Sequence, residues 1–304
     1  MDFAAPTRNS RKLERLEVEV TRRCPLKCMH CSSRAGQGKL SNELSFKDIM
    51  KIIFEFSELG GRILTITGGE PFIRGESFIT NILKIAKRRA LSTRIYTSGY
   101  LMNERIVQKI RDNGADIVGV SIEGTEITHD MITCVKGSYK RAVETLGLLQ
   151  EYEVPTRIHF TPMRINYTNF QHVVNLGETL GVKDIKVFAF SPQGRGYDNR
   201  HKLELSSTEM NEFVISATKF VGQDRLNIWF GGVIRGLSDS CSVGKKIAIT
   251  CEGDALPCLG LRERRNILGN LGNVMREPLL EIWRRIERVT PRNTCLCATL
   301  KASI

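Results

Sequence analysis

The sequence lacks any long hydrophobic run. No stretch approaches the ~20 consecutive apolar residues that a membrane-spanning helix needs, so no membrane partner is expected. The first residues, MDFAAPTRNSRK, contain no apolar segment of the kind found in secretory signals, which predicts a cytoplasmic protein. Internal repeats and low-complexity tracts are also absent, and the hydrophobic (41%) and charged (26%) fractions are ordinary for a globular chain. The 304 residues are enough for one barrel, or one barrel with a small appendage.

Cysteine, in contrast, is well represented. Nine cysteines in a chain expected to be cytoplasmic favour metal ligation over disulfides. They are grouped: three lie near residue 28, three lie between Cys241 and Cys258, and two are Cys295 and Cys297. Cys134 stands alone, and we expect it to be a small buried hydrophobic residue.

The charge balance is strongly basic, with a net charge of +12 and a pI near 9.4. Such an excess can attract nucleic acid, phosphorylated metabolites or acidic peptides. The basic runs, such as 87–89 and 262–265, are spread out and fall mostly on segments with helical patterns. No aromatic residues interleave with them, so solvated helix faces are favoured over a nucleic-acid platform.

Short β-branched runs alternate with amphipathic patterns between residue 15 and about residue 230. Strands are predicted at 15–20, 62–67, 93–97, 116–121, 156–161 and 184–190, with a further candidate at 227–230. Helices are predicted at 46–59, 78–89, 104–113, 139–151, 170–180 and 208–221. Ser45 with Asp48, and Ser206 with Glu209, have the spacing of N-terminal caps. Six successive βα units predict an α/β fold with a parallel sheet, either an incomplete barrel or an open doubly wound sheet.

The pattern changes after about residue 235. Two short strands, at 246–250 and 255–257, are predicted around a turn at 252–254. A helix at 279–288 follows, and then the two terminal cysteines.

Cys24, Cys28 and Cys31 form a C-x3-C-x2-C loop just after the first predicted strand, where barrel folds place their chemistry. Three thiolates can bind three irons of a [4Fe–4S] cluster. No fourth cysteine lies nearby, so one iron stays open to a small molecule. A zinc site is the alternative, although zinc loops usually pair with a second Cys/His pair downstream. The spacing resembles the signature of the radical S-adenosylmethionine (SAM) superfamily, in which SAM fills the open position.

Gly68, Gly69, Glu70 and Pro71 follow the second predicted strand. A glycine pair lets a ligand approach the backbone closely, and Glu70 can accept hydrogen bonds from an ammonium group. Alone, this motif is weak and also fits a simple turn. Beside the cysteine loop it resembles the GGE motif of the superfamily, which implies that these residues bind the methionine amine of SAM.

Further candidates for SAM binding lie at later strand ends. The resemblance implies that Ser98, Ser121 and Glu123 contact the ribose or the methionine carboxylate. It also implies that backbone around Phe190, which precedes a P-x-G-R segment ending at Arg195, meets the adenine.

Arg157 and His159 alternate with Ile158, so both point to one face of the fifth predicted strand. If that face lines the barrel, the two residues bind the SAM carboxylate or the substrate. If it faces the helices, they are ordinary packed polar residues. Asn166 lies just beyond and is a weaker candidate, and His30 is expected to pack against the cluster.

Cys241-x11-Gly253-x4-Cys258 resembles the opening of the SPASM or twitch extension, which holds auxiliary iron–sulfur clusters. Cys295 and Cys297 would complete four thiolates. A zinc site or loose thiols are the alternatives.

The extension also departs from the full SPASM pattern. It has C-x-C near its end where that pattern has C-x2-C-x5-C-x3-C, so we expect one auxiliary cluster, in which Cys251 can replace one of the four ligands.

The resemblance implies a partial (β/α)6 barrel over residues 1–234 and a small β-hairpin and helix extension that binds a cluster over residues 235–304. It further implies reductive cleavage of SAM to a 5′-deoxyadenosyl radical, which abstracts a hydrogen atom from the substrate. A reducing partner such as flavodoxin or ferredoxin would supply the electron.

Two substrate classes remain open. Enzymes with such extensions often cross-link or oxidise peptides, and this is the reading we favour. Others dehydrogenate or cyclise small metabolites such as sugars, aminocyclitols or nucleotides. The 23 residues before Cys24 are too few for a leader-binding domain, which weakens the prediction of a peptide substrate without excluding it. A non-catalytic iron–sulfur electron-transfer protein is a third possibility, but it would have no use for the GGEP motif.

Overall fold

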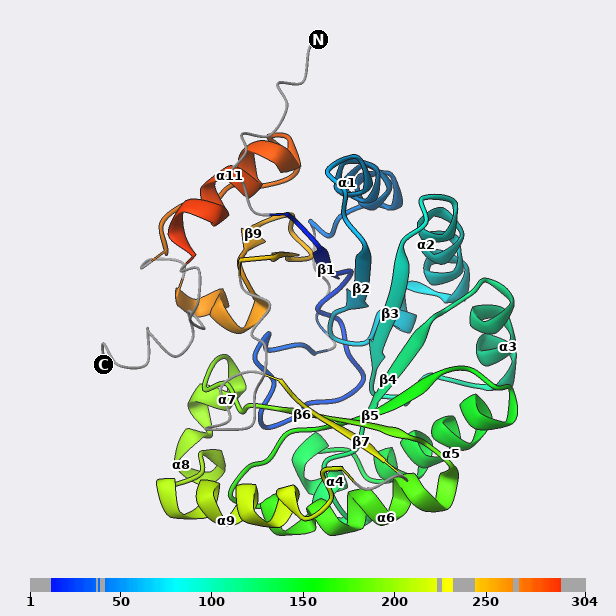
Figure 1. Cartoon of the computed structure of the whole chain (residues 1–304), viewed down its shortest axis with the longest axis vertical. Helices are drawn as coiled ribbons and strands as arrows, with labels where there is room; N and C mark the ends of the chain where they lie inside the picture. Colours follow the sequence, from blue (N-terminus) through cyan, green and yellow to red (C-terminus); the bar gives the residue numbers. More distant parts are fainter. Residues whose placement is uncertain are drawn as a thin grey trace.

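The computed structural model describes residues 12–36, 38, 42–222, 226–231, 244–264 and 268–290. Within these residues, nine strands form one sheet in the order β7-β6-β5-β4-β3-β2-β1-β8-β9. The sheet curves around a central space and carries most of its helices on the outer side (Figure 1). Among the described strands, β7 and β9 form the two edges of the sheet, so the barrel is open and the predicted partial barrel is confirmed.

Strands β1 to β7 run parallel, each paired with its neighbour in sequence. The 227–230 candidate is confirmed as β7, which extends the sheet beyond β6. The seven strands are Arg15–Glu19 (β1), Ile63–Thr67 (β2), Ser92–Thr97 (β3), Ile117–Ser121 (β4), Thr156–Phe160 (β5), Asp184–Phe188 (β6) and Asn227–Gly231 (β7).

Two of the longer helices, α1 and α9, begin where capping residues predicted them. Ser45 and Asp48 exchange hydrogen bonds ahead of α1, and Ser206 and Glu209 do so ahead of α9. The longer helices are Phe46–Glu58 (α1), Glu76–Arg88 (α2), Glu104–Asp112 (α3), Glu126–Thr133 (α4), Ser138–Glu151 (α5), Phe170–Leu180 (α6), Ser207–Thr218 (α9) and Leu279–Val289 (α11). Shorter ones are Pro71–Arg74 (η1), Tyr167–Asn169 (η2), Arg195–Asp198 (α7), Arg200–Leu203 (α8) and Leu259–Arg264 (η3).

Helix α4 was not predicted from hydrophobic periodicity, because its apolar residues do not share a buried face. Ile127 and Met131 are exposed, whereas His129 and Ile132 are buried. The helix ends at Cys134, which takes a left-handed conformation (φ 57°) and is exposed. The expectation that Cys134 is buried was therefore wrong.

The core lies between the strands and the outer helices. Alternate strand residues such as Ile95, Ile158, Ile185 and Val187 are fully buried in it. Their neighbours on each strand face the inside of the ring, because side chains alternate between the two faces of a strand.

The predicted hairpin is confirmed as β8 (Lys246–Ile249) and β9 (Ala255–Leu256), which pair antiparallel. Strand β8 also pairs in parallel with β1, so the extension continues the barrel sheet. An incomplete barrel leaves the outer edge of β1 with unpaired backbone groups, and β8 satisfies them. The division at residue 234 stays a prediction, since residues 232–243 lie outside the described residues.

No helix in the described part of the chain is both long enough and apolar enough to cross a membrane.

Candidate active site

The three cysteines of the loop after β1 lie together at the carboxyl end of that strand. Cys24 is buried with Leu26 and Ala35, and the partly buried Cys28 and Cys31 pack against them. The loop therefore brings three sulfur atoms to one apolar site at the strand ends.

Backbone hydrogen bonds fix the course of this loop. The Cys24 N–H donates to the carbonyl of Gly36 (2.8 Å), and the Cys31 N–H donates to the carbonyl of Cys28 (3.2 Å). The Ala35 N–H donates to the Cys31 sulfur (3.3 Å). N–H groups directed at sulfur stabilise thiolate ligands.

The donor set fits an iron–sulfur cluster better than a single metal ion. Burial raises the pKa of Cys24 to about 12 and that of Cys28 well above its usual value, and the neighbouring thiols raise both further. A bound cation would offset this cost, because coordinated thiols are deprotonated. Within the described residues no three His, Cys, Asp or Glu side chains converge on one ion, whereas a cluster spreads its ligands over separate irons.

The glycine pair after β2 packs against the start of the cysteine loop. The Gly69 N–H donates to the carbonyl of Thr21 (2.7 Å), and the Glu70 N–H donates to the carbonyl of Arg23 (2.9 Å). A Cβ on Gly68 would lie 2.4 Å from the Thr21 oxygen, and one on Gly69 would lie 2.4 Å from the Arg23 oxygen. Glycine at both positions is therefore required by the loop itself, in addition to any ligand.

The Glu70 carboxylate is fully buried and faces the end of β3, beside the buried Pro71. It accepts hydrogen bonds from the Thr97 hydroxyl (2.8 Å) and from the Ser98 N–H (2.9 Å) and hydroxyl (2.5 Å). Burial raises its pKa, and these hydrogen bonds oppose the shift. Glu70 thus ties the ends of β2 and β3 together; its contact with the SAM ammonium, and the role of Ser98 toward SAM, stay predictions.

Glu123, just after Ser121 at the end of β4, is a second buried carboxylate. It accepts the Thr161 N–H (3.0 Å), and His30 Nε2 of the cysteine loop lies 3.5 Å from its Oε1. Burial raises the pKa of Glu123 to about 8 and lowers that of His30 to about 4. Both pKa shifts favour the uncharged forms of the two side chains, so burial does not favour an ion pair here. The contacts of Ser121 and Glu123 with SAM stay predictions.

Asn166 has a structural task that its sequence context did not reveal. Its side-chain amide donates to the carbonyls of Glu123 (3.1 Å) and Thr161 (3.0 Å), while its oxygen accepts the Met163 N–H (2.6 Å). It holds together the segments that follow β4 and β5.

The segment after β6 closes over the cysteine loop. The Arg195 side chain donates to the carbonyl of Cys28 (2.9 Å), and its N–H donates to the carbonyl of Cys31 (3.0 Å). A Cβ on Gly194 would lie 2.5 Å from that Cys31 oxygen. Arg195 is thus part of the cluster site, and the P-x-G-R segment was the signal for it. Phe190 packs beside this segment, near Met29; its contact with adenine stays a prediction.

Arg157 and His159 face the inside of the ring. Their side of β5 therefore lines the barrel and does not pack against the outer helices. The His159 ring lies 4.5 Å from that of Tyr96 on β3 and 5.0 Å from that of Phe188 on β6. Arg157 forms an ion pair with Asp184 (3.2 Å) near the amino end of β5. Arg157 therefore lies toward the strand end opposite the one that carries the cysteine loop, and roles for Arg157 and His159 toward SAM or the substrate stay predictions.

Of the extension's cysteines, only Cys251 and Cys258 lie within the described residues; Cys241, Cys295 and Cys297 lie outside them. The Cys258 sulfur is 3.5 Å from the Lys246 ammonium at the start of β8, whereas the fully buried Cys251 follows its end. These positions are about 16 Å apart along the strand. The separation argues against both thiols binding one cluster.

Helix η3 joins the extension to the strand ends. Arg262 forms a buried ion pair with Glu19 of β1 (2.8 Å), and the Glu263 N–H donates to Gln193 (3.1 Å). The Glu263 carboxylate in turn accepts the Gly194 N–H (2.9 Å). The extension therefore contacts the same segment that holds the cysteine loop.

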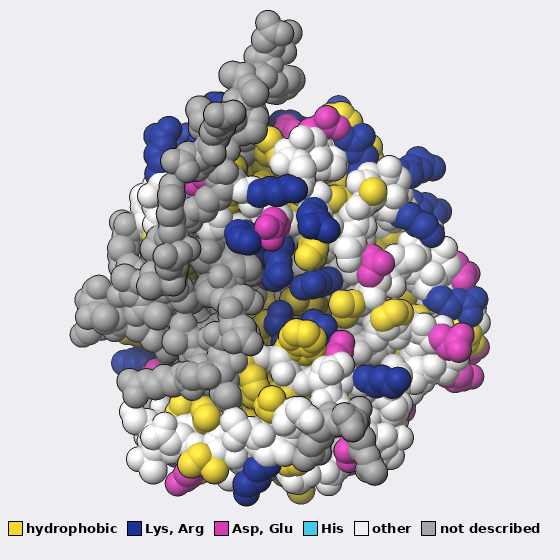
Figure 2. Space-filling view, viewed as in Figure 1, with side chains coloured by type: hydrophobic (Ala, Val, Ile, Leu, Met, Phe, Trp, Pro, Cys, Tyr) yellow, Lys and Arg dark blue, Asp and Glu magenta, His cyan; other side chains and the backbone are white. Residues whose placement is uncertain are grey.

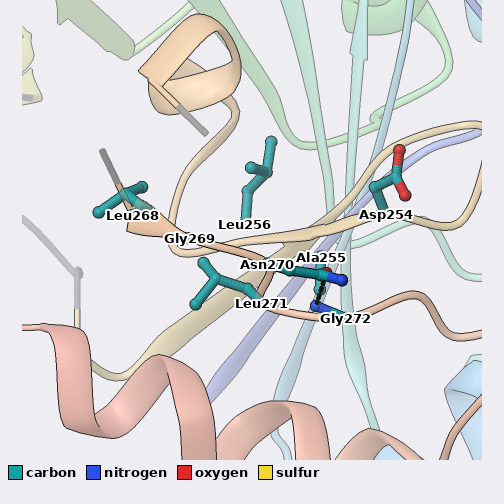
Figure 3. A pocket seen from close by; sticks show the side chains of 8 residues that line it. All are labelled: Asp254, Ala255, Leu256, Leu268, Gly269, Asn270, Leu271 and Gly272. Carbon is teal, nitrogen blue, oxygen red and sulfur yellow. Dashed lines mark hydrogen bonds between the residues drawn. The ribbon is translucent and has the colours of Figure 1, made fainter. Parts of the chain in front are cut away.

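A pocket of about 380 Å³ lies beside β9 and residues 268–272 (Figure 3). Its one carboxylate, Asp254, accepts a hydrogen bond from Asn273 (2.9 Å), and no cysteine lines it. It is not a candidate active site.

Two family models match this chain. The model of the radical SAM superfamily matches residues 18–180, and that of an iron-sulfur cluster-binding domain, named SPASM, matches residues 241–298.

Curated relatives such as the following are 26–30% identical to this chain. They include an AdoMet-dependent heme synthase of Nitratidesulfovibrio vulgaris (27%, over 70% of this chain and 54% of the relative) and a PqqA peptide cyclase of Granulibacter bethesdensis (26%, over 69% and 56%). A third is an Fe-coproporphyrin III synthase of Methanosarcina barkeri (28%, over 58% and 44%). The chain spans about half the length of these relatives.

Solved structures share the fold at lower identity. SuiB of Streptococcus suis bound to S-adenosylmethionine has a TM-score of 0.75 at 19% identity, over 90% of this chain and 66% of SuiB. Native anSMEcpe with bound AdoMet has a TM-score of 0.73 at 16% identity, over 91% and 83%. With its cysteine loop and glycine pair arranged as described, the chain belongs to the radical SAM superfamily, which implies a [4Fe–4S] cluster and SAM as cofactors, and it carries a SPASM iron–sulfur cluster-binding extension.

Proposed function

We propose that this enzyme modifies a peptide by hydrogen-atom abstraction, forming a cross-link or an oxidised residue. The observation that carries the radical chemistry is the buried three-cysteine loop held against Gly68–Glu70. The peptide substrate is supported by similarity to PqqA peptide cyclases, one of which, from Rhizobium meliloti, is 28% identical over 73% of this chain. When bound, the cluster and SAM supply a 5′-deoxyadenosyl radical.

The protein's own residues have three tasks in this scheme. Cys24, Cys28 and Cys31 hold the cluster, and the segment at Arg195 covers it. Backbone at Gly68–Gly69 and the side chains of Ser98, Ser121 and Glu123 would bind SAM at the strand ends. The ring interior would hold the substrate below. An auxiliary cluster at Cys258 would accept one electron from the substrate radical, which completes the oxidation to product, and a flavodoxin or ferredoxin would reduce the first cluster.

Dehydrogenation or cyclisation of a small metabolite is the second candidate, because heme and Fe-coproporphyrin III synthases are as similar to this chain as the peptide cyclases are. Similarity to these relatives supports a small-molecule substrate as the alternative to a peptide. A bare electron carrier is disfavoured because Gly68–Glu70 would have no ligand to bind.

Anaerobic reconstitution with iron, sulfide, SAM and dithionite tests the radical chemistry. Release of 5′-deoxyadenosine is expected even without substrate, and its absence from a fully loaded protein would contradict the proposal.

The substrate class is tested with short peptides encoded beside the gene, deuterated at candidate positions. Transfer of deuterium into 5′-deoxyadenosine, with a matching mass loss in the peptide, is expected. Transfer only from small metabolites would move the assignment to the second candidate.

A further inference from the structure

The inside of the ring carries an excess of positive charge. Four cationic side chains, Arg94, Arg157, Lys186 and Lys246, enter it from different strands, and the carboxylates Glu17 and Asp184 lie among them. On β1, Arg15 and Glu19 share the face of Glu17, and Glu19 is paired with Arg262 (2.8 Å), so the cations outnumber the carboxylates. Figure 2 shows Lys and Arg side chains gathered near the middle of the face, over the space that the strands surround in Figure 1.

Aromatic rings define the middle of this space. Tyr96, His159 and Phe188 come from three different strands and contact one another, edge to face. Gly119 on β4 leaves room for His159, since a Cβ there would lie 2.0 Å from its ring. The three rings form a fixed wall beside which the cations lie.

Two of the cations already have carboxylate partners. Arg157 pairs with Asp184 (3.2 Å), and Lys246 pairs with Glu17 (2.9 Å). Lys186 lies 4.6 Å from the centre of the Phe188 ring.

Arg94 interacts with the Tyr96 hydroxyl. In the described part of the chain, neither Arg94 nor Lys186 forms an ion pair with a carboxylate. The positive charge that lacks a carboxylate partner is therefore concentrated on Arg94 and Lys186.

Across the residues that the structure describes, three buried side-chain nitrogens of the ring interior have no hydrogen-bond partner. Arg94 Nε, Arg157 Nε and His159 Nε2 are buried and have no partner among the described residues. His159 is 5% exposed and Arg157 is 9% exposed, so water has little access to them. Buried donors without partners are costly, and their clustering indicates a ligand that accepts hydrogen bonds.

We propose that the ring interior binds a carboxylate of the substrate, held between Lys186 and Arg94, with Arg157 and His159 lining the site. This inference rests on the proposed function and specifies the substrate as acid-bearing, either a peptide with Asp, Glu or a free C-terminus, or a carboxylated metabolite. A planar carboxylate matches the fork of a guanidinium group.

A phosphate is less suited to this site. Phosphate sites usually add several backbone N–H groups, and those of β3, β5 and β6 are used in the sheet.

The site also sets where the substrate would lie. Lys186 is two residues before the end of β6, about 7 Å below the strand ends that carry the cysteine loop. A carboxylate anchored there would hold the rest of the substrate toward the loop. Lys186 and Arg94 are therefore substrate-binding residues.

The test measures the thermal midpoint of the reconstituted full-length protein with glutarate as the probe, at ionic strength matched with sodium chloride. Glutarate is expected to raise the thermal midpoint of the wild type. Lys186→Met or Arg94→Met is expected to raise the half-saturating glutarate concentration at least tenfold, because each removes a cation that binds the carboxylate. Lys84→Met, at an exposed position on α2, serves as the matched control and should bind glutarate as the wild type does.

Three results would overturn the proposal: no glutarate effect on the wild type, an equal effect of uncharged glutaramide, or undiminished binding by Lys186→Met. A stronger effect of phosphate than of glutarate would overturn the assignment to a carboxylate. If Lys186→Met does not fold, Lys186→Gln replaces it.

Substrate-free 5′-deoxyadenosine release is measured on the wild type and on the control Lys84→Met, and the two should agree within twofold. Its loss from the wild type would reject the proposed function, whereas normal release without glutarate binding would reject only this site.

Discussion

The strand ends and the ring interior of this protein differ in whether their charged side chains have partners within the protein. At the strand ends, the Glu70 carboxylate accepts hydrogen bonds from Thr97 and Ser98 before any ligand arrives. In the interior, Lys186 and Arg94 lack a carboxylate partner among the described residues. The first region is built to hold cofactors that a whole superfamily shares, and the second is left for a substrate to complete.

The largest effect expected is loss of the cysteine loop. Replacing Cys24, Cys28 and Cys31 together by alanine should remove about four irons per chain and abolish 5′-deoxyadenosine release, since no thiolate remains to bind the first cluster. Iron analysis and product chromatography measure both. Tetrahedral zinc at the wild-type loop, or normal release by the triple variant, would contradict the assignment.

The next comparison is between the two described cysteines of the extension. Cys258→Ala should lower the iron content by an auxiliary cluster, because the Cys258 sulfur faces the start of β8 beside Lys246. Cys251→Ala should keep all its iron and cost only about 1 kcal/mol of folding free energy, from a packing defect in the core. Iron loss in Cys251→Ala and not in Cys258→Ala would reverse the two roles.

The strand-end site could be predicted from the sequence because its parts are local. The C-x3-C-x2-C loop and Gly68–Glu70 are short contiguous motifs, and a regular βα alternation places both at strand ends. The parallel sheet, the capped helices and the C-terminal hairpin follow from the same local patterns, and the structure confirms them.

The interior could not be predicted in the same way. Arg94, His159 and Lys186 lie on three strands, and only the closure of the sheet brings them together. The pairing of β8 with β1 also depends on an unpaired edge, which no local pattern reveals. Arg195 was predicted within a motif, yet its bond to the Cys28 carbonyl depends on how two distant loops pack.

The glycines at the strand ends should be intolerant of a single methyl group. Gly69→Ala would place a Cβ 2.4 Å from the Arg23 carbonyl oxygen and should cost about 2–3 kcal/mol of folding free energy, with reduced iron incorporation. Gly147→Ala on α5 is the control, because no atom lies within 4 Å of its Cβ. That substitution should stabilise the protein by about 0.5–1 kcal/mol. Denaturant unfolding of the two variants measures the difference, and equal effects would show that the close contact is not limiting.

The last effect concerns Lys186 and, unlike that of Gly69→Ala, is a gain in stability. Burial lowers the pKa of Lys186 to about 8 from its ordinary 10.5. Keeping it protonated therefore costs folding free energy below pH 8, where the folded and unfolded chains are both charged. Lys186→Met should stabilise the substrate-free protein by about 1–2 kcal/mol at pH 7, and this gain should shrink as the pH rises from 8 to 10.5. Urea unfolding at pH 7 and at pH 9.5 measures it. A pH-independent loss of stability in Lys186→Met would mean that the lysine serves the fold, and that the interior resembles the strand ends after all.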